Sequence, residues 1–169
     1  MKNIKRLILT FQICLFVSGI TAFFIPEGMH LIIDNIILKT LGLNDWLLYV
    51  NEGVQHVDLH YQFFFYGTDW LAFAHVILAV LFIGAYQDPI RNIWLFKFGI
   101  IASVLVFPLA LIMGKIRDIP LVWRCLDCCF GLLAIPLLWY ILKRIKQLEN
   151  DEFKPNFRRA NAGTTMLFI

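Results

Sequence analysis

Residues 93–113 read IWLFKFGIIASVLVFPLALIM, and Lys97 is the one charged side chain in this stretch. A helix needs about 20 apolar residues to cross the hydrocarbon core of a bilayer, so the stretch is long enough to span a membrane. Because lipid offers the backbone no hydrogen-bond partners, a spanning segment of this kind must be helical. The stretch therefore predicts a transmembrane helix.

Three further stretches have a similar length and composition. They are residues 7–25, 66–86 and 121–142. None alternates polar and apolar residues at period two, which argues against a membrane β-barrel. The charged start of the chain resembles a signal peptide, but its apolar run is longer than the roughly 7–15 residues typical of one. We therefore expect four retained spans.

The composition of the whole chain agrees with this expectation. Of 169 residues, 60% are hydrophobic and 16% are charged, and the mean hydropathy is +0.73. A soluble domain usually carries about 25% charged residues. The composition excludes a disordered chain, a nucleic-acid-binding domain and an ordinary soluble enzyme.

The basic residues predict how the spans are oriented. Those at the predicted inner ends are Lys2, Lys5, Arg6, Arg91, Lys143, Arg144 and Lys146. Acidic residues outnumber basic ones on the other side. Since basic loops stay in the cytoplasm, we expect both termini there, in a cell membrane such as the bacterial inner membrane. Residues 1–142 would form the membrane domain, and residues 143–169 a basic cytoplasmic tail.

The long connection over residues 26–65 is not a simple solvated loop. Apolar residues recur at helical spacing from Met29 to Leu43, which predicts a helix lying in the membrane interface and ended by Gly42. A second short helix is expected from Asp45 to about His60. The predicted fold is therefore all-α: an integral membrane four-helix bundle with a short interfacial helical cap on the extracytoplasmic side. The cap either simply covers the bundle or closes over a binding site.

Short connections predict which spans are neighbours. Residues 87–92 and 114–119 are the two short loops, and they favour antiparallel packing of the second, third and fourth spans. Pro108 and Pro136 lie inside spans and are expected to kink them.

Ionisable residues inside the spans are the strongest functional signal. Apart from Lys97, which lies near the inner end of the third span and can extend to the interface, they are Asp69, His75, Arg124 and Asp127, all in the outer half of the bilayer. Each costs roughly 2.5–3.5 kcal/mol on insertion scales, so such residues need a partner or a role. Arg124 and Asp127 share a helix face, and an Asp69–Arg124 bridge is geometrically reasonable. The cluster is either an ion pair that joins two spans or an outward pocket for a small polar ligand or lipid head group.

Cys125 and Cys128 form a C-x-x-C motif at the outer end of the fourth span. The motif resembles that of four-helix membrane thiol oxidoreductases linked to quinones, which implies a redox role for the pair. Those enzymes also use a second cysteine pair in an external loop, and residues 26–65 contain no cysteine. Buried cysteines otherwise act as small packing residues, which is the alternative reading here.

His56 and His60 are four residues apart, with Glu52 one turn earlier, a spacing that metal ligands can have. No fourth ligand is visible, so a polar helix face is the simpler reading, and we expect no metal or other cofactor. Nucleotide-binding and hydrolase motifs are also missing from the sequence.

Two classes of function remain open at this stage. The first is a non-enzymatic membrane subunit or scaffold with a ligand-binding polar cluster, and the second is a thiol/quinone oxidoreductase. The expected partners are the lipid bilayer and either another membrane protein or a second copy of the chain, and no nucleic acid.

Overall fold

The computed structural model describes the backbone of residues 2–165 and the side chains of residues 2–148. Over this part of the chain all regular structure is helical, which confirms the predicted all-α fold. The elements are α1 (Lys2–Ala22), α2 (Ile25–Ile33), α3 (Ile36–Thr40), α4 (Asn44–His60), α5 (Phe63–Gln87), α6 (Ile93–Pro108), the π-helix η1 (Leu109–Met113), α7 (Gly114–Ile116) and α8 (Leu121–Thr165).

Four of these segments are long and apolar enough to cross a membrane. They are α1, α5, the continuous run from α6 through η1 to α7, and α8 as far as Leu148. All four sequence-predicted spans are therefore helices, although their ends differ. The first begins already at Lys2, and α8 continues past Leu142 to Thr165 without a break. The predicted kink at Pro108 coincides with the start of the π-helix.

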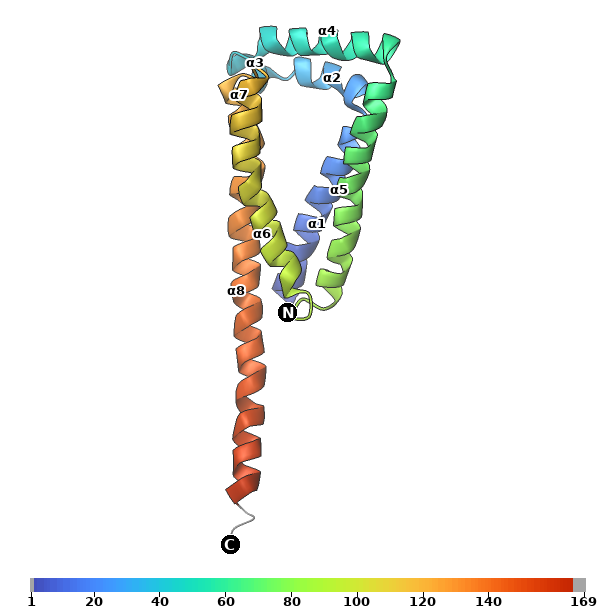
Figure 1. Ribbon diagram of the computed structural model, residues 1–169. Coiled ribbons are helices and arrows are strands. Elements are labelled where there is room, and N and C mark those ends of the chain that lie inside the picture. Colours follow the sequence, from blue (N-terminus) through green and yellow to red (C-terminus); the bar gives the residue numbers. More distant parts are fainter. Residues whose placement is uncertain (1, 166–169) are drawn as a thin grey trace.

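The long helices are arranged as two antiparallel pairs, in which α1 packs along α5 and α6 packs along α8 (Figure 1). The short loop between α5 and α6 does not make them close neighbours, because the two helices diverge from it. The predicted packing of the second span against the third is therefore limited to the ends near their shared loop, where Phe82 meets Phe96. Loop length limits the distance between helix ends only, and packing along the helices decides the rest.

Small residues explain these pairings. A Cβ atom added to Gly19 of α1 would lie 2.9 Å from the Ala72 carbonyl oxygen of α5. A Cβ atom added to Gly131 of α8 would lie 2.7 Å from the Ser103 carbonyl oxygen of α6. Glycine thus lets the backbones approach closely within each pair. In lipid, where apolar burial gives little driving force, such close packing stabilises helix association.

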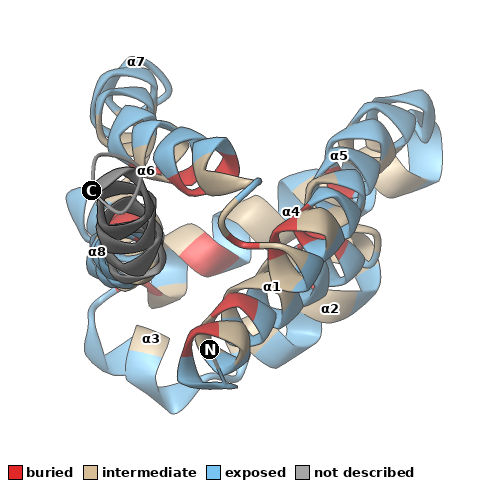
Figure 2. Cartoon of the chain, turned by 90° about the horizontal axis from the view of Figure 1, so that it is seen from below, coloured by how far each residue is buried: buried red, intermediate tan, exposed pale blue. Residues whose placement is uncertain are grey.

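The two pairs meet at the end of the molecule that carries the N-terminus. The buried cluster there draws on all four long helices and comprises Ile4, Ile8, Phe82, Ala85, Leu95, Phe96, Leu138, Ile141 and Ile145. At its centre the ring of Phe82 lies 5.0 Å from that of Phe11 and 6.2 Å from that of Phe96. Figure 2 shows, from this end, that buried positions are few and that much of each helix surface is exposed.

The other end is crossed by α2, α3 and α4, which we call the cap (Figure 1). The predicted helix over 29–43 is divided into α2 and α3, because Asn35 caps α3 by accepting hydrogen bonds from the Ile37 and Leu38 amides. Gly42, with φ of 74°, follows the end of α3 as expected. The second cap helix, expected from Asp45, is α4.

Candidate functional site

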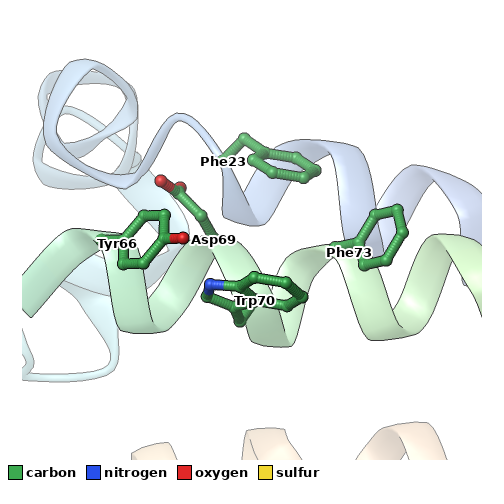
Figure 3. A pocket seen from close by; sticks show the side chains of 5 residues that line it. All are labelled: Phe23, Tyr66, Asp69, Trp70 and Phe73. Atoms are coloured by element: carbon green, nitrogen blue, oxygen red, sulfur yellow. The ribbon is translucent and has the colours of Figure 1, made fainter.

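A pocket of about 270 Å³ lies between the cap end of α1 and the first turns of α5. Phe23 lines it from just beyond α1, and Tyr66, Asp69, Trp70 and Phe73 line it from α5 (Figure 3). We call it the Asp69 pocket. Its lining combines one carboxylate with four aromatic rings.

The aromatic side chains of α5 owe their arrangement to helical spacing. Tyr66, Trp70 and Phe73 are four and three residues apart, which puts them on one stripe of the helix. The Trp70 ring lies 6.1 Å from the Tyr66 ring and 6.1 Å from the Phe73 ring, edge to face in both cases. The stripe therefore forms a continuous aromatic wall.

Asp69 is partly buried beside this wall and lies six residues beyond Phe63, about 9 Å along the helix. Among the described side chains it takes part in no ion pair and no hydrogen bond. A carboxylate attracts a cation by its charge, and aromatic faces attract one by their quadrupole. The Asp69 pocket therefore combines two features that favour a cationic ligand, such as an organic ammonium group.

Arg124 lies elsewhere, near the start of α8. Its aliphatic chain packs against Gly114, where an added Cβ atom would overlap the Arg124 Cδ atom. Its Nη1 atom donates a hydrogen bond to the Leu111 carbonyl oxygen in the π-helix at 3.4 Å. Its Nε atom is buried without a hydrogen-bond partner in the described structure. Arg124 thus joins the two helices of its own pair.

The four intramembrane ionisable residues therefore do not form one cluster. Asp69 and His75 belong to the α1–α5 pair, whereas Arg124 and Asp127 belong to the α6–α8 pair. The expected Asp69–Arg124 bridge does not form, and the one ion pair among the described side chains joins Lys39 and Asp34 on the cap. The His75 ring lies 3.0 Å from the Leu71 carbonyl oxygen of its own helix.

The cysteines of the C-x-x-C motif lie on α8. Cys128 is buried and Cys125 is exposed, and both are free thiols. The Cys125 carbonyl oxygen accepts a hydrogen bond from the Cys129 thiol at 3.3 Å. The oxidoreductase alternative stays a prediction.

His56 and His60 stack on the exposed surface of α4, with ring centroids 4.4 Å apart. The His60 Nδ1 atom lies 2.9 Å from the His56 carbonyl oxygen. Within the described residues, Glu52 does not complete with them a group of three metal-ligating side chains.

The pocket itself was not recognised from the sequence. Sequence reasoning gives none of the four aromatic residues of the pocket a place in a binding site. The signal was present as three aromatic residues on one helix stripe beside Asp69. Phe23 could not be found in this way, since it comes from a distant part of the chain.

Comparison with known proteins provides no relative for this chain. No protein-family model, no curated protein and no solved structure matches it.

Proposed function

We propose that this chain is a non-enzymatic multi-pass membrane protein that binds an organic ammonium group in the Asp69 pocket. The observation that carries the proposal is an Asp69 carboxylate that has no ion-pair or hydrogen-bond partner among the described side chains and lies beside four aromatic side chains. Such cages are the usual way in which proteins bind quaternary and other alkylammonium ligands. The pocket volume of about 270 Å³ accommodates a head group of that size.

The proposed orientation places the cap outside the cell and both termini in the cytoplasm. Basic residues gather at the end opposite the cap, where several contact aromatic rings. The Lys5 ammonium lies 5.3 Å from the Tyr86 ring centroid, and the Arg144 guanidinium lies 5.3 Å from that of Tyr140. This is the composition of a cytoplasmic membrane interface.

In this orientation the Asp69 pocket lies in the outer half of the bilayer, just below the head groups of the outer leaflet. Tyr66 and Trp70 are also residue types that favour this level. The nearest abundant source of ammonium groups there is the lipid itself, as ethanolamine or choline head groups. A free alkylammonium compound has the same chemistry and is the other possible source.

Arg124 is a weaker candidate for ligand binding. Its aliphatic chain is engaged with Gly114 and its guanidinium with the Leu111 carbonyl oxygen. An anionic ligand would compete with that hydrogen bond, whereas a cation in the Asp69 pocket would replace no protein contact.

Native mass spectrometry of the purified protein, titrated with defined lipids, tests the proposal. We expect phosphatidylethanolamine or phosphatidylcholine to bind in preference to phosphatidylglycerol, and Asp69→Asn to weaken that binding about tenfold or more. Trp70→Leu should weaken it roughly 2- to 30-fold, by loss of one cation–π contact. Asp45→Asn, on the exposed surface of α4, is the matched control.

Adding tetramethylammonium or free choline distinguishes a lipid head group from a free ligand as the source of the ammonium group. Displacement of bound lipid by either compound at micromolar concentration favours a free ligand. Displacement only at concentrations far above this favours the lipid head group. Equal binding of all three lipids by the wild type and Asp69→Asn contradicts the proposed function.

A further inference from the structure

A second hollow lies on the α1–α5 pair, closer to the middle of the helices. It has a volume of about 290 Å³. We call it the Gln12 groove, and its lining residues are Leu9, Gln12, Ile13, Phe16, Ala79, Val80 and Ile83. Its floor includes Ala79, which is 2% exposed and too small to fill the space between the larger side chains around it.

The groove opens along one flank of the α1–α5 contact, where Gln12 is half-buried and lies roughly 40° around α1 from the fully buried Ile8. At 100° per residue, Ile13 lies roughly 160° around α1 from Phe11, which packs on the buried cluster. Leu9, Ile13 and Phe16 are exposed by 42%, 52% and 45% of their surfaces. In a membrane, this face would meet either lipid tails or another protein.

Gln12 makes lipid an unfavourable occupant of the groove. It lies five residues inside the apolar run that begins at Leu7, about 8 Å along the helix from the inner end of this run and thus within the hydrocarbon. Its side chain is too short to reach an interface, and it forms no hydrogen bond among the described side chains. Acyl chains have no donor or acceptor to offer, so the amide would stay unpaired among them.

We propose that the Gln12 groove is the interface between two copies of this chain. All copies insert with the same orientation, so in a parallel dimer with a two-fold axis along the membrane normal each residue meets its own counterpart at the same depth. A primary amide has both a donor and an acceptor, so the two Gln12 side chains satisfy each other by reciprocal hydrogen bonds. Side-chain amides are known to hold transmembrane helices together in this way.

The apolar residues of the groove suit such a contact. Leu9 and Phe16 lie about one turn on either side of Gln12, and Ala79 leaves room beside it. The partner's side chains would fill this room, so that the amides pair in a closed, lipid-free contact. This interface is independent of the Asp69 pocket, since the two share no lining residue.

The dimer is tested on the full chain, reconstituted in liposomes at falling protein-to-lipid ratios. Single-molecule photobleaching should show two copies per spot at high ratios. Gln12→Leu, which keeps the size of the side chain, should weaken the association roughly 3- to 30-fold. Thr10→Val is the matched control, because Thr10 lies roughly 160° around the helix from Gln12 and its hydroxyl bonds to the Arg6 carbonyl oxygen.

Cysteine cross-linking locates the contact. In a protein whose four native cysteines are replaced by alanine, Gln12→Cys should form an intermolecular disulfide under mild oxidation. A protein that retains Cys14 alone should not, because Cys14 lies roughly 160° around α1 from position 12. A wild type that is monomeric at every ratio overturns the proposal. So does a Gln12→Leu variant that associates like the wild type, or cross-linking through Cys14 as efficient as that at position 12.

Discussion

The indole rings of Trp46 on α4 and Trp123 on α8 lie 4.9 Å apart, with an angle of 48° between their planes. This contact ties the cap to the α6–α8 pair. The chain itself ties the cap to the other pair, since α4 leads directly into α5. The cap therefore bridges the two helix pairs at the end where they are farthest apart (Figure 1).

Removing this aromatic contact should loosen the bridge. We expect a double-mutant cycle of Trp46→Ala and Trp123→Ala to give a coupling free energy of about 0.5–1.5 kcal/mol. The measurement is reversible unfolding in detergent. Tyr49→Ala, on the same helix but 74% exposed, should change the free energy of unfolding little. Additive effects of the two tryptophan substitutions would contradict the bridging role.

Arg124 and Asp69 should differ in their importance for stability. Arg124→Ala removes the hydrogen bond from Nη1 to the Leu111 carbonyl oxygen, which also accepts from the Gly114 amide, and it removes the packing of the aliphatic chain on Gly114; the loss should cost about 1–3 kcal/mol of unfolding free energy. Asp69→Asn should change stability by less than about 0.5 kcal/mol, because Asp69 has no partner among the described side chains. Thermal unfolding of both variants without added lipid makes the comparison. Equal, large losses for the two would indicate a bridge between them.

Two glycine substitutions should change the free energy of unfolding in opposite directions. Gly131→Ala places a Cβ atom 2.7 Å from the Ser103 carbonyl oxygen and should destabilise the α6–α8 pair by about 1–3 kcal/mol. Gly53→Ala, in α4, meets nothing within 4 Å and should stabilise that helix by about 0.5–1 kcal/mol. Both free energies come from the same unfolding experiment. A neutral Gly131→Ala variant would rule out close packing at this position.

The break in the cap depends on Asn35. Its side-chain oxygen accepts hydrogen bonds from the amides of Ile37 at 3.0 Å and Leu38 at 3.3 Å. Asn35→Ala should destabilise α3 by about 1 kcal/mol, while Asn35→Asp should largely preserve it. Hydrogen exchange of these two amides, followed by NMR in detergent, provides the readout. Unchanged protection in Asn35→Ala would show that the side chain does not cap the helix.

The sequence was sufficient for the spans and the cap. A helix that crosses lipid must satisfy its backbone internally and be apolar over about 20 residues, so hydropathy alone identified all four. The ends of the cap helices were predicted less completely. Gly42 marks the end of a helix as expected, but the single helix expected from Met29 to Leu43 is divided at Asn35, which starts a new one.

The pairing of the spans could not be inferred from loop length. It depends on where small residues let backbones approach, as Gly19 does for α1 and α5, and Gly131 for α6 and α8. Gly99 and Ser103 form a small-xxx-small pattern that points to a packing face on α6, although it does not name the partner helix.

The Asp69 pocket and the Gln12 groove could not be predicted from the sequence for a related reason. The opposite charges of Asp69 and Arg124 suggested that the two residues pair. Charge complementarity alone, however, does not reveal which helix faces meet. A search for charged residues does not find Gln12, because its side chain is a neutral amide. Such an amide is nevertheless also costly to leave unpaired in hydrocarbon. The aromatic stripe beside Asp69 was visible in the sequence, but only the fold adds Phe23 to it.

The divergence of the two helix pairs gives the molecule an outline that widens from one leaflet to the other. A wedge of this kind fits best where the membrane bows outward on its wider side, because the leaflet there is already expanded. In a flat bilayer, the lipids around such a wedge must tilt to fit its outline. A change in membrane curvature would therefore bear first on the angle between the α1–α5 pair and the α6–α8 pair.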